Sequence, residues 1–212
     1  MPKRTSMLIK KKVVKKVAKP RVPSGKVTDP DIRVLLVDKL RKQFYQSRVV
    51  NEMCVCRCRV DVAVLSPQSG FVGYEIKSEA DSLTRLRRQV TNYDHVFSYM
   101  TIVVYDNHYN HALEIIPSYW GVIKVTKNGF GKLALVDARS PTRNPRRKQY
   151  QVADMLWKQE IIDTLITLGV PKRGLGQRKV RQLVDMLTQA VQSTDHLEQL
   201  VITKMAAREN WH

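Results

Sequence analysis

Apolar and polar positions alternate most clearly in two short segments, residues 59–65 and 73–78. This period of two is typical of β-strands that place one face in a core. Proline, serine and glycine lie between the segments and favour a turn, so an antiparallel pair is predicted. Side chains two positions apart share a face of a strand, so Glu75 and Lys77 project together, and the neighbouring strand would place Asp61 beside them.

The other elements follow from the spacing of apolar residues. The patterns predict a helix from Asp29 to about residue 44, strands over 49–57 and 99–104, helices over 81–93 and 108–115, a hairpin of 120–125 with 133–136, and three C-terminal helices over 152–166, 180–191 and 197–205. We therefore expect an α/β protein with a core at 29–138, a linker at 139–150 and a helical module at 151–212. That module would pack as a plain bundle or bind DNA in helix-turn-helix manner through its basic residues.

The balance of charge is strongly basic. The chain of 212 residues has 37 Lys and Arg against 19 Asp and Glu, a net charge of +18. This excess predicts a polyanionic partner, nucleic acid first and an anionic membrane surface second. No apolar run is long enough to span a bilayer, and the basic N-terminus lacks the apolar core of a signal peptide, so we expect a cytoplasmic protein. Charge alone fits a DNA-coating protein as well as an enzyme.

Two basic segments would contact phosphates without reading sequence. Residues 1–28 combine many cations with little to bury, which predicts a disordered arm, although a localisation signal or a fusion remnant would look the same. The linker at 139–150 mixes arginines with prolines and is either a phosphate contact or a solvated connection. The candidate phosphate-binding residues of the two segments are Lys10, Lys11, Lys12, Lys15, Lys16, Arg143, Arg146 and Arg147.

All three cysteines occupy alternate positions, at Cys54, Cys56 and Cys58. An odd number at this spacing is no disulfide framework and fits a reducing compartment. Zinc sites space their cysteines more widely, so packing of the thiols into the core is favoured over metal binding.

Two carboxylates on neighbouring strands repel each other unless a cation lies between them, and a hard divalent ion such as Mg²⁺ takes few carboxylates together with waters and phosphate oxygens. Lys77 would then position a water and stabilise charge growing on a phosphate. A solvated strand face is the competing interpretation of Glu75-x-Lys77. Glu52 becomes a third acid of the site if a turn near residue 57 brings it to the side of Asp61.

The helix over 81–93 adds polar groups next to this strand pair. Arg85, Gln89 and Tyr93 recur every four residues and form one stripe, which would hold a phosphate or orient Lys77. Arg88 lies beside that stripe as exposed charge with access to a nucleic-acid backbone.

The ordered series of Asp61, the triplet Glu75-Ile76-Lys77 and the helix with Gln89 and Tyr93 resembles the PD-(D/E)XK nuclease superfamily, in particular its RecB-like members. The run GYEIKSEADSLTRLRRQVTNYDHVF, followed by TIVV and IPSYWG, resembles a poorly characterised bacterial and phage branch of that superfamily. The similarity covers roughly residues 48 to 211, and it implies that the protein acts in the bacterial cytoplasm or in a phage-infected cell.

The resemblance implies a restriction-endonuclease-like mixed sheet flanked by helices. It implies that Asp61 and Glu75 bind Mg²⁺ or Mn²⁺ with the backbone carbonyl of Ile76, and that Lys77 assists the attacking water. Gln89 and Tyr93 would be accessory catalytic residues, and Glu52 matches an acid that precedes the core aspartate in this branch.

The resulting hypothesis is a metal-dependent nuclease that acts on DNA, with RNA not excluded. The alternatives are a nucleic-acid-binding protein without catalysis and a phage-encoded inhibitor or interaction factor on the same fold. Oligomeric state is not predicted.

Overall fold

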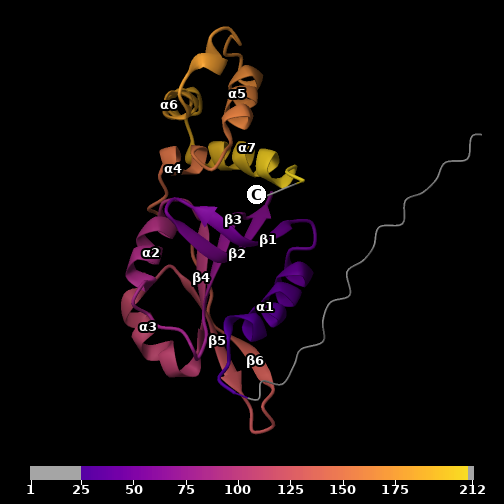
Figure 1. Cartoon of the computed structure of the whole chain (residues 1–212), viewed down its shortest axis with the longest axis vertical. Helices are drawn as coiled ribbons and strands as arrows, with labels where there is room; N and C mark the ends of the chain where they lie inside the picture. The colour runs from indigo at the N-terminus through magenta and orange to yellow at the C-terminus, as the bar shows by residue number, and fades with distance from the viewer. Residues whose placement is uncertain (1–24, 210–212) are drawn as a thin grey trace, which may run out of the picture.

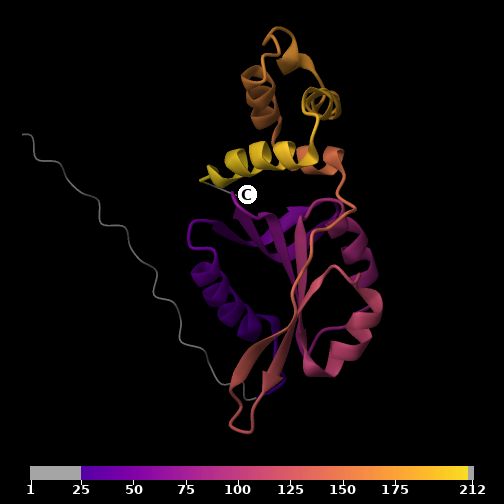
Figure 2. The ribbon, with the colours of Figure 1, turned by 180° about the vertical axis from the view of Figure 1, so that it is seen from behind.

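Six strands form one mixed sheet in the computed structural model, which describes residues 25–209 (Figures 1 and 2). The strands are β1 (Arg48–Val55), β2 (Cys58–Ser66), β3 (Gly70–Lys77), β4 (Tyr99–Tyr105), β5 (Gly121–Lys127) and β6 (Leu133–Arg139), and they lie in this order across the sheet. The first three are antiparallel, β3, β4 and β5 are parallel, and β6 returns antiparallel to β5. This architecture confirms the predicted α/β class with a helix-flanked sheet.

Helices cover both faces of the sheet, as Figures 1 and 2 show. On one face, α1 (Asp29–Gln43) buries Ile32, Leu36 and Leu40, whose spacing of four residues places them on one side of the helix. The opposite face carries α2 (Leu86–Asp94), the short helix η1 (Asp106–His108) and α3 (Tyr109–Ile115). A sheet buried on both sides explains why all eight residues of β3 are buried.

The helix predicted from residue 81 begins only at Leu86. Asp81 does not cap that helix. Its carboxylate instead accepts hydrogen bonds from the backbone N–H and the hydroxyl of Ser78, at 2.8 and 2.6 Å. Short polar side chains compete for backbone groups in this way, which favours a turn directly after β3.

The C-terminal region contains more helices than predicted. Its elements are α4 (Gln149–Ala153), α5 (Lys158–Thr167), η2 (Leu175–Gln177), α6 (Val180–Ala190) and α7 (Thr194–Ala206). The expected single helix over 152–166 is therefore wrong, because the chain breaks between Asp154 and Trp157 into α4 and α5. In both ribbon views α4 and α7 lie between the end of the sheet and the pair α5 and α6.

A buried carboxylate attaches this region to the sheet. Glu198 of α7 is 2% exposed and accepts hydrogen bonds from the N–H of Phe71 at 2.8 Å and from the hydroxyl of Ser98 at 2.7 and 2.8 Å. Gly70 allows this close approach, because its φ is +80° and a Cβ there would lie 2.6 Å from a carboxylate oxygen of Glu198. The helical module is thus docked through a specific polar contact as well as apolar packing.

The basic segment at 139–150 runs without regular structure from residue 140 to 148 and packs along the protein. Asn144 is buried, and its amide donates to the carbonyls of Asp94 and Phe97, at 2.8 Å each. Arg147 pairs with Asp195 at 2.6 Å and with Glu198 at 3.1 Å. The segment is held to both the sheet core and the helical module.

Among residues 25–209, no helix combines the length and the apolar character that crossing a membrane requires. The predicted arm at 1–28 and its five candidate lysines fall almost entirely outside the described residues, which begin at Gly25.

Candidate active site

The strands β2 and β3 separate at the point where the two predicted acids stand. Their pairing runs from Ser66 opposite Gly70 to Val62 opposite Tyr74, and Asp61 and Glu75 are the next residues on each strand. The side chain of Asp61 spans the opening, because its Oδ2 accepts a hydrogen bond from the N–H of Ile76 at 2.7 Å. Separation of two paired strands leaves backbone groups without ladder partners, and this bond satisfies one of them.

A second residue fixes Asp61 from the opposite face of the sheet. Arg33 of α1 donates to Asp61 Oδ1 at 3.2 Å and also to the Asp61 carbonyl oxygen. Asp29, one helical turn before Arg33, holds the guanidinium at 2.6 and 2.7 Å. The helix therefore places the Asp29–Arg33 ion pair against the strand opening, so α1 holds Asp61 in position as well as covering the sheet.

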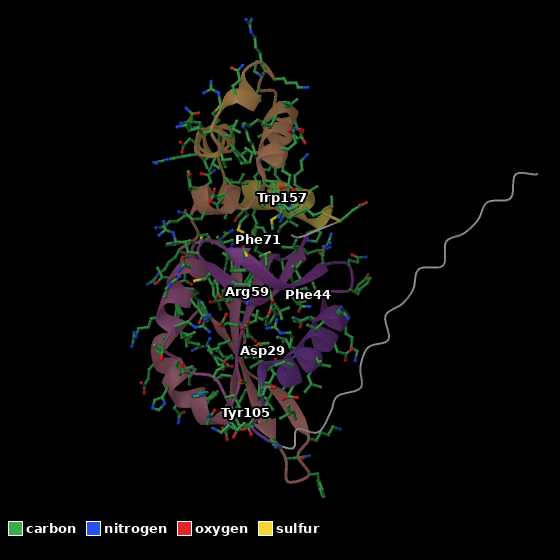
Figure 3. All side chains as sticks on the ribbon, in the orientation of Figure 1. Asp29, Phe44, Arg59, Phe71, Tyr105 and Trp157 are labelled. Carbon is green, nitrogen blue, oxygen red and sulfur yellow. The ribbon has the colours of Figure 1, made fainter. Side chains whose placement is uncertain are left out.

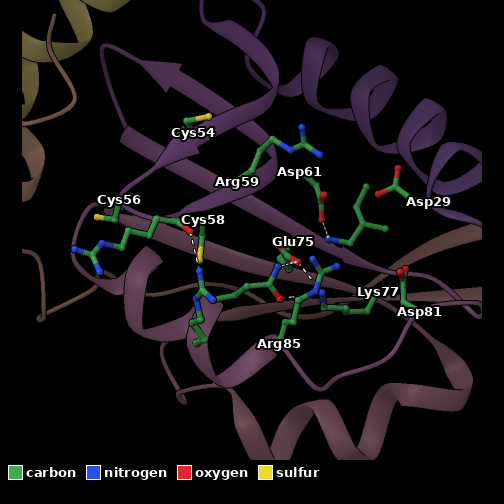
Figure 4. A pocket seen from close by; sticks show the side chains of 14 residues that line it. Asp29, Cys54, Cys56, Cys58, Arg59, Asp61, Glu75, Lys77, Asp81 and Arg85 are labelled. Carbon is green, nitrogen blue, oxygen red and sulfur yellow. Dashed lines mark hydrogen bonds and ion pairs between the residues drawn. The ribbon is translucent and has the colours of Figure 1, made fainter.

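Three predicted side chains, those of Lys77, Gln89 and Tyr93, contact the carboxylate of Glu75; Figure 4 shows Glu75 beside Lys77. Oε1 of Glu75 accepts from Lys77 Nζ at 2.7 Å and from Gln89 Nε2 at 2.5 Å, and Oε2 accepts from the Tyr93 hydroxyl at 2.9 Å. Lys77 also donates to Gln89 Oε1 at 3.0 Å. Glu75 is 1% and Lys77 3% exposed, so little water competes for these hydrogen bonds, and they hold both charged side chains in position.

Burial sets the electrostatics of the site. Loss of water raises the pKa of Glu75 to about 7, the nearby carboxylate of Asp61 adds to the rise, and Lys77 opposes it. Burial also raises the pKa of Asp61, while the hydrogen bond from Ile76 counteracts that rise. Burial and the neighbouring Glu75 raise the pKa of Tyr93, so its hydroxyl keeps its proton and remains a donor. Two acids that destabilise each other's charge form a favourable place for a cation.

The acids line an open cavity of about 600 Å³ whose walls carry positive charge (Figure 4). Four exposed arginines contribute to those walls: Arg57, Arg59, Arg85 and Arg88. Arg85 and Arg88 were predicted from the helix pattern, whereas Arg57 and Arg59 lie on the β1–β2 hairpin and were not singled out. The acids lie at the base of the cavity and the arginines around it. This arrangement suits an anion that is bound by the arginines and, through a metal ion held between them, by the acids.

The donor set fits Mg²⁺. Within residues 25–209, no group of three or more His, Cys, Asp or Glu side chains is arranged to hold a metal. Two carboxylates and a backbone carbonyl still match this ion, which binds through one or two carboxylates and keeps several waters or phosphate oxygens. An ionised carboxylate has about four acceptor positions. Glu75 uses three of them and Asp61 two, so each acid retains capacity for a ligand bond.

Glu52 is not brought to this cavity. The hairpin places it level with Asp61, between the pairs Asn51–Val62 and Met53–Val60, but its φ of +56° bends the strand there. Its carboxylate lies 3.5 Å from Arg59 and lines a different cavity. The assignment of Glu52 as a third acid of the metal site is therefore wrong for this conformation.

The linker arginines also lie away from the active cavity. Arg143 and Arg147 pair with Asp195, at 2.5 and 2.6 Å, and the Arg147 side chain is only 9% exposed. Arg146 is exposed and lies over the ring of Tyr119, 6.0 Å from its centroid. Arg147 serves the docking of α7 through Glu198 and is not available to phosphate, whereas Arg146 remains on the surface.

The cysteine prediction fails for two of three thiols. Cys54 and Cys56 are exposed, and only Cys58 is partly buried against the core. Regular strand structure ends at Val55, and Cys56 occupies the hairpin turn with a φ of +53°, so the alternation does not continue through the run. All three residues line the active cavity at its hairpin side.

Comparisons with known proteins place the chain in a phage family. Residues 23–210 match the model described as bacteriophage P4 protein cII. A comparison with curated proteins finds no match.

Two solved structures are weakly similar. A protein of unknown function from Silicibacter pomeroyi has a TM-score of 0.38 and 19% identity, over 63% of this chain and 86% of that one. SfsA from Pyrococcus furiosus in complex with Ca²⁺ has a TM-score of 0.33 and 11% identity, over 53% of this chain and 62% of its own. These scores are too low to support an argument, and they do not confirm the PD-(D/E)XK resemblance. By the match over nearly its whole length, the chain belongs to the bacteriophage P4 protein cII family.

Proposed function

We propose that this protein is a Mg²⁺-dependent nuclease that hydrolyses phosphodiester bonds of DNA. The observation that carries the proposal is the convergence of Asp61, Glu75 and Lys77 at the opening between β2 and β3. The PD-(D/E)XK resemblance of the sequence agrees with this arrangement. The positive walls of the cavity supply the affinity for a polyanion that such an enzyme needs.

The four arginines around the cavity would bind the phosphates on either side of the scissile bond. Arg88 is already oriented toward the hairpin, because its guanidinium donates to the carbonyl of Arg57 at 3.1 Å. Guanidinium groups form charge-assisted, often bidentate hydrogen bonds with phosphate, which fix orientation as well as affinity.

Asp61, Glu75 and the carbonyl of Ile76 would hold Mg²⁺, which when bound supplies positive charge next to the phosphate and lowers the pKa of a bound water. Lys77 would donate its third N–H, beyond those on Glu75 and Gln89, to the attacking water, and the positive charge of its ammonium would stabilise the negative charge that grows on the phosphate. The water gives a proton to solvent and forms a new P–O bond as the bond to the leaving oxygen breaks, and that oxygen takes a proton from solvent.

Gln89 and Tyr93 are positioning residues in this scheme. Gln89 contacts both Glu75 and Lys77, and Tyr93 contacts the other oxygen of Glu75. Together they limit rotation of the carboxylate and keep the ammonium in reach of the cavity. Positioning of this kind lowers the entropy lost at the transition state.

One observation favours the alternative of a DNA-binding protein without catalysis. Arg33 lies against Asp61 and occupies part of the carboxylate that a metal would use. In that alternative the Asp61–Arg33 and Glu75–Lys77 pairs are structural, and the arginines alone contact DNA. A phage-encoded inhibitor would use the same surface for a protein partner.

A substrate panel separates these functions. Purified protein is incubated with labelled single-stranded, double-stranded and branched DNA, and with RNA of the same sequence, with Mg²⁺, with Mn²⁺ and with chelator. The nuclease proposal predicts metal-dependent cleavage of at least one DNA. Binding of DNA without cleavage of any substrate would favour the non-catalytic protein, and a stable complex with a host protein in place of DNA binding would favour the inhibitor.

A further inference from the structure

A second cavity lies directly beside the active cavity and shares Cys54, Cys56 and Arg59 with its wall. Its volume is about 610 Å³, large enough for a drug-sized or nucleotide-sized ligand. It lies between β1 and the helical module, and its lining there comes from α4, the connection from α4 to α5, and the end of α7. Along the long axis in Figure 3, Arg59 lies between Trp157 of that module and Asp29 at the far wall of the active cavity.

The lining of the second cavity includes methionine and tryptophan side chains in addition to the cysteines that it shares with the active cavity. Met53, Met155 and Met205 contribute thioethers, and Trp157 contributes an indole that is 49% exposed. Arg208 stacks on that indole, 4.2 Å from the ring centroid, and Glu160 anchors the guanidinium at 2.5 and 2.7 Å. Trp157 is thus a braced aromatic surface, the kind of group on which planar rings stack.

The polar groups of the cavity select a hydrogen-bond donor. Among residues 25–209, the buried side-chain oxygen of Gln151 has no hydrogen-bond partner, and Gln151 lines this cavity, so the lining includes an acceptor without a donor. Glu52 and Asp154 add acidic groups to the same lining. The two arginines of the lining, Arg59 and Arg208, lie against Glu52 and Glu160, which leaves Asp154 and the Gln151 oxygen to accept hydrogen bonds from amino groups. The ligand class is therefore a neutral, flat molecule with N–H donors.

Phosphate and base therefore find different surroundings on the two sides of Arg59. The lining of the active cavity contains four arginines, whereas that of the second cavity contains the Trp157 indole, methionine thioethers and the Gln151 acceptor, and Arg59 belongs to both. We propose that the second cavity binds an unpaired nucleobase of the strand whose phosphate lies in the active cavity. This inference rests on the proposed function for its ligand, and it specifies the substrate as DNA with unpaired nucleotides beside the scissile bond. In a duplex the faces of a base are stacked on its neighbours and its amino group is paired with the opposite strand. A base could therefore enter the second cavity only after leaving the duplex.

The test scans 2-aminopurine, a fluorescent base with an exocyclic amine, along a single-stranded oligonucleotide bound to the full chain in the presence of chelator. Stacking on Trp157 predicts strong quenching at one position and weak quenching at its neighbours. Affinities for single-stranded and duplex DNA are measured by anisotropy under the same conditions. Wild type is expected to bind the single strand about tenfold more tightly than the duplex, since loss of one stacked base costs about five- to a hundredfold in affinity.

Two variants separate recognition from folding. Trp157→Ala and the nearly isosteric Gln151→Met should each weaken single-strand binding about five- to tenfold, abolish the position-specific quenching, and leave duplex affinity within twofold. Val180→Ala, which changes an exposed apolar residue of α6, is the control and should behave as wild type. Equal weakening of both DNA forms, uniform quenching along the strand, or a preference of wild type for duplex would overturn the inference.

The chelator separates this test from the proposed catalysis. A base-specific signal from a protein that cleaves nothing with Mg²⁺ would contradict the nuclease and leave the base site standing. Cleavage without any single-strand preference would do the reverse.

Discussion

The carboxylate of Asp61 accepts a hydrogen bond from the backbone N–H of Ile76 at 2.7 Å, across the point where β2 and β3 separate. This bond places one acid next to the backbone that carries the other acid and the lysine. The strand opening, the two carboxylates and the carbonyl of Ile76, which is the third candidate metal ligand, thus belong to one local structure.

Asp61 should contribute to stability through that bond. Asp61→Ala would leave the N–H of Ile76 without its partner and would remove one of the two carboxylates that hold the Arg33 guanidinium, which costs about 1–3 kcal/mol of unfolding free energy. Asp61→Asn keeps an acceptor for Ile76 and should cost about 1 kcal/mol or less. Urea denaturation measures both, and equal losses in the two variants would show that the hydrogen bond is not the cause.

Glu75 should make stability depend on pH. Its pKa is raised to about 7 in the folded protein, so between about pH 4.5 and 7 the native state binds more protons than the unfolded state. The unfolding free energy therefore falls as pH rises through this window, by at most about 1.4 kcal/mol per pH unit from this group, and is flat above it. Glu75→Gln removes the titration. Urea denaturation at pH 4.5 to 8 gives the unfolding free energy of wild type and of this variant. The difference between the two should change with pH below about 7, and a difference that is constant over the whole range would contradict the assignment.

Divalent metal should bind where the two acids meet. Mg²⁺ or Ca²⁺ would raise the melting temperature of wild type, by an amount that corresponds to about 2.7 kcal/mol at a hundred times the dissociation constant. The shift should be larger at pH 8 than at pH 6, because the ion needs the charged form of Glu75. Asp61→Asn and Glu75→Gln should lose the shift, whereas Asp137→Asn on β6 should keep it. A shift that persists in both site variants would locate the metal elsewhere.

Glu198 should hold the helical module on the sheet. Glu198→Ala removes the partner of Phe71 N–H and Ser98 and leaves the buried Arg147 with less charge compensation, for an expected loss of about 3–5 kcal/mol. Glu114→Ala, in a more accessible position on α3, should change stability by less than about 0.5 kcal/mol. Differential scanning calorimetry compares them, and near-wild-type stability of Glu198→Ala would argue that apolar packing alone docks α7.

The sequence predicted the local part of the site well. The period of two along β3 placed Glu75 and Lys77 on one face, and the period of four along α2 added Gln89 and Tyr93. Asp61 followed from an antiparallel pair with a short turn. These inferences depend on neighbours within one element or across one hairpin, for which backbone geometry is fixed.

Contacts between distant segments were not predictable in the same way. Arg33 contacts Asp61 across 28 residues of sequence, and Arg147 contacts Glu198 across 51 residues. Composition alone therefore did not reveal that Arg33 would contact an acid of the candidate site or that Arg147 would be a buried contact between the linker and α7. The positive φ angles of Glu52 and Cys56 bend the β1–β2 hairpin and invalidated the alternation argument for both residues. Positive φ at non-glycine residues is uncommon and leaves no reliable trace in a sequence.

The proposed nuclease activity and the role of Lys77 are tested most directly by the single-turnover cleavage rate of a labelled DNA with Mg²⁺. The rate is measured for wild type and for Lys77→Ala purified in parallel. Lys132→Ala, an exposed lysine near the β5–β6 turn, is the matched control. We predict that Lys77→Ala lowers the rate about 10²–10⁴-fold while its DNA affinity stays within a few fold, and that the control cleaves as wild type. Equal cleavage by Lys77→Ala and wild type, or no cleavage by either folded protein, would contradict the proposed nuclease.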